Sequence, residues 1–141
     1  MKKSLFILIF SLFAGMISAQ VLKEADVPSV VRKSFSAQYP GSKATLWRKS
    51  GEMFEARYAD GKLMKGATFT AGGDLMELLT EVPVNELPKS ITTYMTKNAA
   101  GVKIIEAYNR VDISGITFYD VLVSGATYVF DFDGNFVKKN N

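Results

Sequence analysis

The feature that most constrains the fold is a motif that occurs twice, 60 residues apart (87 − 27 = 60). The first copy begins at Val27-Pro28 and ends at Tyr39-Pro40-Gly41, and the second begins at Leu87-Pro88 and ends near Gly101. In each copy a hydrophobic residue and a proline precede apolar residues at helical spacing, with polar residues between them. The sequence therefore predicts two helices in equivalent positions of a duplicated unit.

After each helix the apolar period changes from about four residues to two, which is typical of half-buried β-strands. Phe54 and Tyr58 fall on one face of the clearest strand, and Glu55 and Arg57 fall on the other. The dipeptide Asp60-Gly61 that follows is a strong hairpin signal. The predicted strands cover residues 43–49, 53–58, 63–70 and 75–82 in the first copy and 102–111, 116–123, 126–132 and 136–138 in the second.

These patterns predict an α+β fold with two tandem helix-plus-four-stranded antiparallel sheet units. We expect the sheets to join side by side with the helices on one face, and the domain to span residues 20–141. Unit one would cover about residues 26–83 and unit two about residues 84–141. Indels between the copies fall at turns, where a duplicated sheet tolerates them best.

Several local features follow from the same reading. Residues 20–26 are polar and are expected to be a mobile lead-in. Asp26 and Asn85 are expected to cap the N-termini of the two helices. Trp47 shares a face with Phe54 and is expected in the core under the first helix, with its indole N–H bonded to a partner.

Residues 1–19 have the composition of a secretory signal peptide. Lys2 and Lys3 form a basic start, an apolar run covers residues 5–13, and Ile17-Ser18-Ala19 ends in a small residue before Gln20. The apolar run is short for a membrane span of roughly 20 residues. We therefore expect cleavage, no stable membrane anchor, and a periplasmic or secreted protein of a Gram-negative bacterium.

The residue inventory excludes several classes of function. Without Lys2 and Lys3, 15 basic residues (17 − 2) face 14 acidic ones, a balance that gives no support to nucleic-acid binding. The chain has no cysteine and no histidine, which removes serine–histidine triads, thiol nucleophiles and the usual zinc ligands. We expect no enzyme activity, no catalytic residue and no cofactor.

A short acidic segment, Asp131–Asn135, resembles the start of a calcium-binding loop. A complete loop also needs a distal glutamate, and no glutamate follows Gly134 in the sequence. A turn between two strands explains the segment equally well, and we expect no metal site.

Several aromatic, proline and glycine marks recur along the chain: Val27-Pro28, Phe35, Tyr39-Pro40, Trp47 and Phe54 in the first copy and Leu87-Pro88, Phe130-Asp131-Phe132-Asp133-Gly134 and Phe136 in the second. Their order resembles the PepSY-like family of exported bacterial proteins, whose fold is related to that of a beta-lactamase-inhibitor protein. The resemblance implies two helix-plus-four-strand units that leave one broad sheet face uncovered, and a binding or inhibitory role.

The candidate binding residues lie on the sheet face opposite the helices, where alternation places charged and aromatic side chains together. Arginine and tyrosine are frequent anchors of protein interfaces. The alternative is that these charges simply pair across the strands of a solvated sheet, at roughly 0.2–1 kcal/mol for each pair. The candidates are Arg48, Glu55, Arg57, Tyr108, Arg110 and Asp120.

The sequence leaves three functions open. The first is a non-enzymatic module that binds an unknown exported protein on the uncovered face, and its most specific form is an inhibitor of an extracytoplasmic enzyme. The second is a pocket between helices and sheet that holds a lipid or peptide. The third is an envelope-associated role through strand pairing at a sheet edge.

Overall fold

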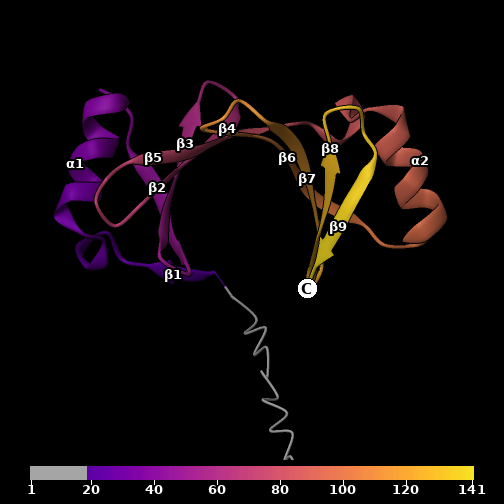
Figure 1. Cartoon of the computed structure of the whole chain (residues 1–141), viewed down its shortest axis with the longest axis horizontal. Helices are drawn as coiled ribbons and strands as arrows, with labels where there is room; N and C mark the ends of the chain where they lie inside the picture. Colours follow the sequence, from indigo (N-terminus) through magenta and orange to yellow (C-terminus); the bar gives the residue numbers. More distant parts are fainter. Residues whose placement is uncertain (1–18) are drawn as a thin grey trace, which may run out of the picture.

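The computed structural model describes residues 19–141, so all of the predicted signal peptide except Ala19 lies outside the described residues. Figure 1 gives the arrangement of the elements. The helices are α1 (Ser29–Gln38) and α2 (Lys89–Asn98), with short 3₁₀ helices η1 (Glu24–Asp26) and η2 (Val84–Glu86) before them. The strands are β1 (Gln20–Leu22), β2 (Ala44–Ser50), β3 (Met53–Asp60), β4 (Leu63–Phe69), β5 (Leu75–Glu81), β6 (Ile104–Asp112), β7 (Thr117–Val123), β8 (Ala126–Asp131) and β9 (Phe136–Asn140).

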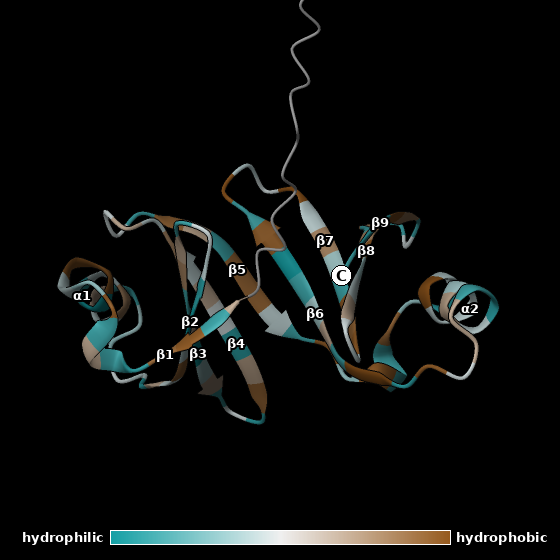
Figure 2. Ribbon diagram, turned by 90° about the horizontal axis from the view of Figure 1, so that it is seen from below, coloured by the Kyte–Doolittle hydropathy of each residue, from teal (hydrophilic) through white to brown (hydrophobic). Residues whose placement is uncertain are grey.

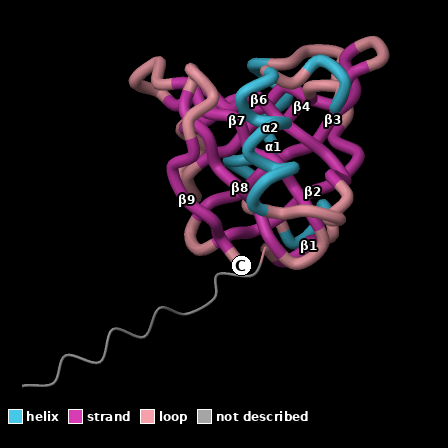
Figure 3. The backbone as a smooth tube through the Cα atoms, turned by 90° about the vertical axis from the view of Figure 1, so that its right-hand side faces the viewer, coloured by secondary structure: helices cyan, strands magenta, loops and turns pink. Residues whose placement is uncertain are grey.

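Within these residues the nine strands form one antiparallel sheet in chain order, β1 to β9. The sheet bends into an arch, and α1 and α2 pack against its convex face at opposite ends (Figure 1). In the side view the two helices project onto one another, α2 in front of α1 (Figure 3). The predicted α+β class with tandem units and helices on one face is confirmed, with β1 as an additional edge strand.

The repeat is visible in the backbone geometry as well as in the sequence. Irregularities in strand pairing occur between Ala44 and Leu46 and, 60 residues later, between Ile104 and Glu106. The turns after β4 and β8 are also alike: Thr70 N–H donates to the carbonyl of Asp74, and Asp131 N–H donates to that of Asn135, at 2.9 Å each. The two units therefore share turn and bulge positions and not only their order of elements.

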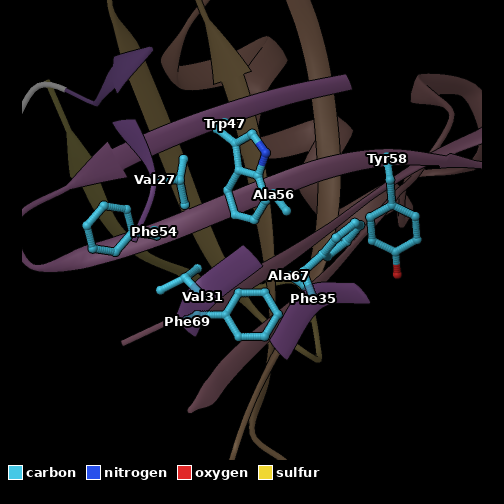
Figure 4. Packing of buried hydrophobic residues seen from close by; sticks show 9 residues of the cluster. All are labelled: Val27, Val31, Phe35, Trp47, Phe54, Ala56, Tyr58, Ala67 and Phe69. Carbon is cyan, nitrogen blue, oxygen red and sulfur yellow. The ribbon is translucent and has the colours of Figure 1, made fainter. Parts of the chain in front are cut away.

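Each helix seals a separate hydrophobic cluster against the convex face. In the first cluster Phe35 of α1 packs edge-on to Trp47 and Tyr58, with ring centroids 5.7 and 5.4 Å apart (Figure 4). In the second, Ile91 of α2 and Phe130 of β8 are fully buried. Each such buried side chain stabilises the fold by about 1.5–3 kcal/mol.

Trp47 lies in the core as predicted, but the expected partner of its indole N–H is absent among the described residues. The neighbours of Trp47 in the cluster, such as Val27, Phe35 and Ala56, offer hydrocarbon surfaces to the ring (Figure 4). An unpaired buried donor costs about 1–3 kcal/mol, which the burial of the large indole ring offsets.

The predicted helix caps are wrong. Pro28 and Pro88 occupy the N-cap positions, neither with a side-chain cap bond, while Asp26 and Asn85 lie in η1 and η2. A proline forces the residue before it into extended backbone, so the helix cannot begin at Val27. The chain reaches this point through a short 3₁₀ turn instead.

The expected mobile lead-in over residues 20–26 is also wrong, because it forms β1 and η1. Leu22 pairs with Trp47 in register and packs against the first hydrophobic cluster. One partly buried leucine and a short ladder are thus enough to order a segment that looks polar by composition.

The glycine in the turn after β8 gives a test of helix-to-sheet packing. Gly134 and Gly125 both have positive φ (83° and 76°), so alanine costs roughly 1–2 kcal/mol at either site. A Cβ at Gly134 would overlap the Oγ of Ser90 in α2, whereas at Gly125 it would meet nothing within 4 Å. We expect Gly134→Ala to lower the free energy of unfolding by about 1–3 kcal/mol more than Gly125→Ala, measured by chemical denaturation. Equal losses would contradict this packing of the turn against α2.

Candidate functional site

The uncovered face of the arch, called the concave face below, contains one hollow of about 670 Å³. No described element crosses the strands on this side (Figure 2). All six residues predicted from strand alternation line this hollow, and they come from β2, β3, β6 and β7: Arg48, Glu55, Arg57, Tyr108, Arg110 and Asp120.

The first polar group joins the two halves of the sheet. The guanidinium carbon of Arg57 on β3 lies 4.1 Å from the ring centroid of Tyr108 on β6, and the Nε of Arg57 pairs with Glu55. The hydroxyl of Tyr108 donates to Glu106 at 3.0 Å. A cation over an aromatic face is worth about 0.5–2 kcal/mol, more when water is excluded.

Gly66 explains how Arg57 reaches across two intervening strands. It lies opposite Arg57 in the β3–β4 ladder and opposite Leu79 in the β4–β5 ladder. A Cβ at Gly66 would lie 3.3 Å from Leu79 Cβ and 3.4 Å from Arg57 Cδ. The missing side chain therefore leaves a channel along which the arginine stem lies flat against the sheet.

The second polar group is a charge cluster on β5, β6 and β7. Arg110 donates from Nε and Nη2 to the two carboxylate oxygens of Asp120, at 2.7 and 3.1 Å, and from Nη1 to Glu77 at 3.3 Å. Its guanidinium carbon lies 4.8 Å from the ring of Phe118. A bidentate pair of this kind is among the stronger charge-assisted interactions in proteins.

The concave face differs from the solvated sheet that alternation alone predicts. Arg57 and Tyr108 are only 7% and 3% exposed, because the bend of the sheet turns both side chains inward onto one another. Arg48 remains half-buried at the edge of the hollow. Sequence reasoning missed Gly66 and Leu79, although Leu79 alternates in phase with Glu77 on β5 and could have been assigned to this face.

Burial and neighbouring charges shift the pKa values of Arg57 and Tyr108, which stack on one another. Burial raises the pKa of Tyr108 to about 12; the nearby positive charge of Arg57 opposes the shift, and the Glu106 carboxylate adds to it. Burial is the largest influence on Arg57 and would lower its pKa, but the charge and hydrogen bond of Glu55, with Tyr108 and Glu106, together outweigh it and hold that pKa above its ordinary value. The stack thus consists of a charged guanidinium on a neutral phenol at physiological pH.

Comparisons with known proteins establish the fold. No family model matches the sequence, and no curated protein matches it. A candidate periplasmic protein of Bacteroides eggerthii superposes with a TM-score of 0.64 at 13% identity, covering 82% of this chain and 88% of that one. A BLIP-like protein of Bacteroides fragilis superposes with a TM-score of 0.54 at 19% identity, covering 79% and 86%. The fold is BLIP-like.

A DUF2874 family protein of Bacteroides ovatus has the same fold, with a TM-score of 0.62 at 16% identity and coverage of 81% and 86%. At these identities the likeness concerns the fold alone, and membership of the PepSY-like family stays a prediction. Within residues 19–141, no helix has the length and apolar character needed to cross a membrane.

The pKa of Tyr108 predicts a specific loss of stability in alkali. Above pH 10 the unfolded chain loses the phenol proton, while the folded chain keeps it until about pH 12, so the free energy of unfolding falls across this interval. In Tyr108→Phe this contribution is absent, and the decline from pH 10 to 12 should be shallower. Denaturation curves collected across the interval measure it, and parallel declines in the two proteins would contradict the assignment.

Proposed function

We propose that this chain is an exported, non-enzymatic module that binds another exported protein in the concave face of its sheet. The observation that carries the proposal is the hollow of about 670 Å³ around which the six candidate residues meet. Its lining combines two arginine–carboxylate groups with a tyrosine and with apolar side chains such as Leu79 and Val129. Mixed linings of this kind, rich in arginine and tyrosine, are characteristic of protein interfaces.

Export and the absence of catalysis rest on different observations. The first nineteen residues have signal-peptide composition, and one protein of the same fold is named as a candidate periplasmic protein. The whole sequence lacks cysteine and histidine, which removes the usual nucleophile–base pairs. Both points support a non-enzymatic binding protein of the periplasm or the medium. The near balance of basic and acidic residues gives no support to a nucleic-acid partner.

A more specific form of the proposal is an inhibitor of an extracytoplasmic enzyme. The support is the BLIP-like fold, which a Bacteroides fragilis protein of that description shares. An arch with one uncovered face is suited to receive a protruding loop of a larger protein. The identity of such an enzyme is a matter for the experiment below.

The alternative of a lipid or peptide pocket between helices and sheet is not favoured by the packing. Phe35 and Val31 of α1, and Ile91 and Met95 of α2, are at most 4% exposed and fill the space beneath their helices. An occupant there would have to displace a hydrophobic cluster. The concave face is the better candidate because its hollow exists without rearrangement.

Site-specific crosslinking in the producing cells tests the docking face. A photoreactive amino acid is placed at Arg48 or Leu122 in the hollow, and at Lys33 or Lys97 on the exposed sides of the helices as matched controls. We expect the two concave positions to capture one common protein and the two helix positions to capture none of it.

The captured protein then allows an affinity measurement. Leu122→Arg should weaken binding roughly tenfold or more, as expected when a central interface residue is lost, and Lys97→Glu should leave it unchanged. Capture from the helix positions, or unchanged affinity in Leu122→Arg with an intact fold, would rule out the concave face as the docking surface.

A further inference from the structure

The two arginines of the hollow differ in how much of each guanidinium group is occupied. Every side-chain nitrogen of Arg110 donates to a carboxylate, from Asp120 or Glu77. Arg57 pairs through Nε alone, with Glu55. Among residues 19–141, neither terminal nitrogen of Arg57 donates a hydrogen bond to a protein acceptor, so most of its N–H donors are unfilled.

The terminal nitrogens of Arg57 are not sealed off from solvent. In the described part of the chain, the one fully buried side-chain nitrogen or oxygen without a partner is the Nε1 of Trp47. The terminal nitrogens of Arg57 therefore keep contact with solvent, and Arg57 lines the hollow. The aliphatic stem of Arg57 lies over Gly66, and its guanidinium plane stacks on the ring of Tyr108. The guanidinium group is therefore already ordered before a ligand binds, which lowers the entropic cost of binding.

The charge distribution around the hollow favours an anionic ligand on this side. On β2 and β3, the two arginines Arg48 and Arg57 face the single carboxylate of Glu55, and Arg48 forms no ion pair within residues 19–141. On β5 to β7, one arginine is outnumbered by four carboxylates: Glu77, Glu106, Asp112 and Asp120. Arg48 and Arg57 therefore form the positive side of the hollow, and Glu106 on β6 is a further carboxylate whose charge acts on Arg57.

We propose that Arg57 anchors an aspartate or glutamate side chain of the protein that docks in the concave face. A carboxylate can accept two parallel hydrogen bonds from the planar guanidinium group, which gives direction as well as affinity. The hollow of about 670 Å³ is far larger than a carboxylate, which fits an acid carried on a polypeptide segment. This inference rests on the proposed function and specifies the chemistry of the partner.

Nuclear magnetic resonance on the isotope-labelled chain gives a test that needs no knowledge of the partner. The Nε–H signal of Arg57 is followed during titration with a capped Gly-Asp-Gly tripeptide, and with capped Gly-Asn-Gly as the neutral isostere. We expect a saturable shift with the aspartate peptide and none with the asparagine peptide. Equal responses to the two peptides would overturn the proposal.

Two variants and a control make the result independent of folding defects, and their peptide affinities are read from the backbone amide signals of the strands that line the hollow. Arg57→Lys should weaken the aspartate peptide about tenfold or more, because a lysine cannot bind bidentately. Glu55→Gln should strengthen it, because the competing internal carboxylate is removed, and misfolding cannot produce such a gain. Lys97→Gln, on the outer side of α2, should leave the affinity unchanged.

The outcomes also separate this inference from the proposed function. Weaker peptide binding in Glu55→Gln would overturn the carboxylate site. So would crosslinking from Arg48 and Leu122 that persists at full strength in Arg57→Lys, and in that case the docking face itself would stand. Loss of that crosslinking in Arg57→Lys, with the fold intact, would support the anchor.

Discussion

The stacking of Arg57 on Tyr108 is the interaction on which the concave face depends. It connects β3 to β6 across two intervening strands, and it is possible because Gly66 leaves room for the arginine stem and because the sheet bends. Arg57 is buried for this reason although it lies on the face without helices. The burial that accompanies this contact raises the pKa of Tyr108, and the contact orders a guanidinium group whose terminal nitrogens have no acceptor within residues 19–141.

Most of the architecture could be predicted from the sequence because it depends on local periodicity. Alternation over residues 53–58 placed Phe54 and Tyr58 under α1 and put Arg57 on the opposite face, as found. The 60-residue repeat predicted two equivalent helices, and they begin at Ser29 and Lys89. The two-residue alternation in the strands and the 60-residue spacing of the repeat are properties of the sequence that the structure retains. They were therefore sufficient to predict the fold class and to place the six candidate residues on one face.

The remaining features depend on contacts between distant segments, which a single sequence does not encode in a local pattern. Strand β1 forms because Leu22 packs beside Trp47. The indole N–H of Trp47 has no partner within the described residues because the groups that surround it are hydrocarbon. The burial of Arg57 requires the curvature of the whole sheet. The misplaced caps at Asp26 and Asn85 had a local cause, since each proline displaces the helix start.

The central strand β5 belongs to both units, and this makes the architecture extendable. Strand β5 is the last strand of the first unit, and it also pairs with β6, the first strand after α2. In this second role it corresponds to β1, which pairs with β2, the first strand after α1. By the same geometry β9 presents an edge on which a third copy could be built without altering any earlier strand. Lys138 and Lys139 place positive charge on that edge, which disfavours pairing with strands of other chains. The first strand of such a copy would therefore have to pair beside two positive charges.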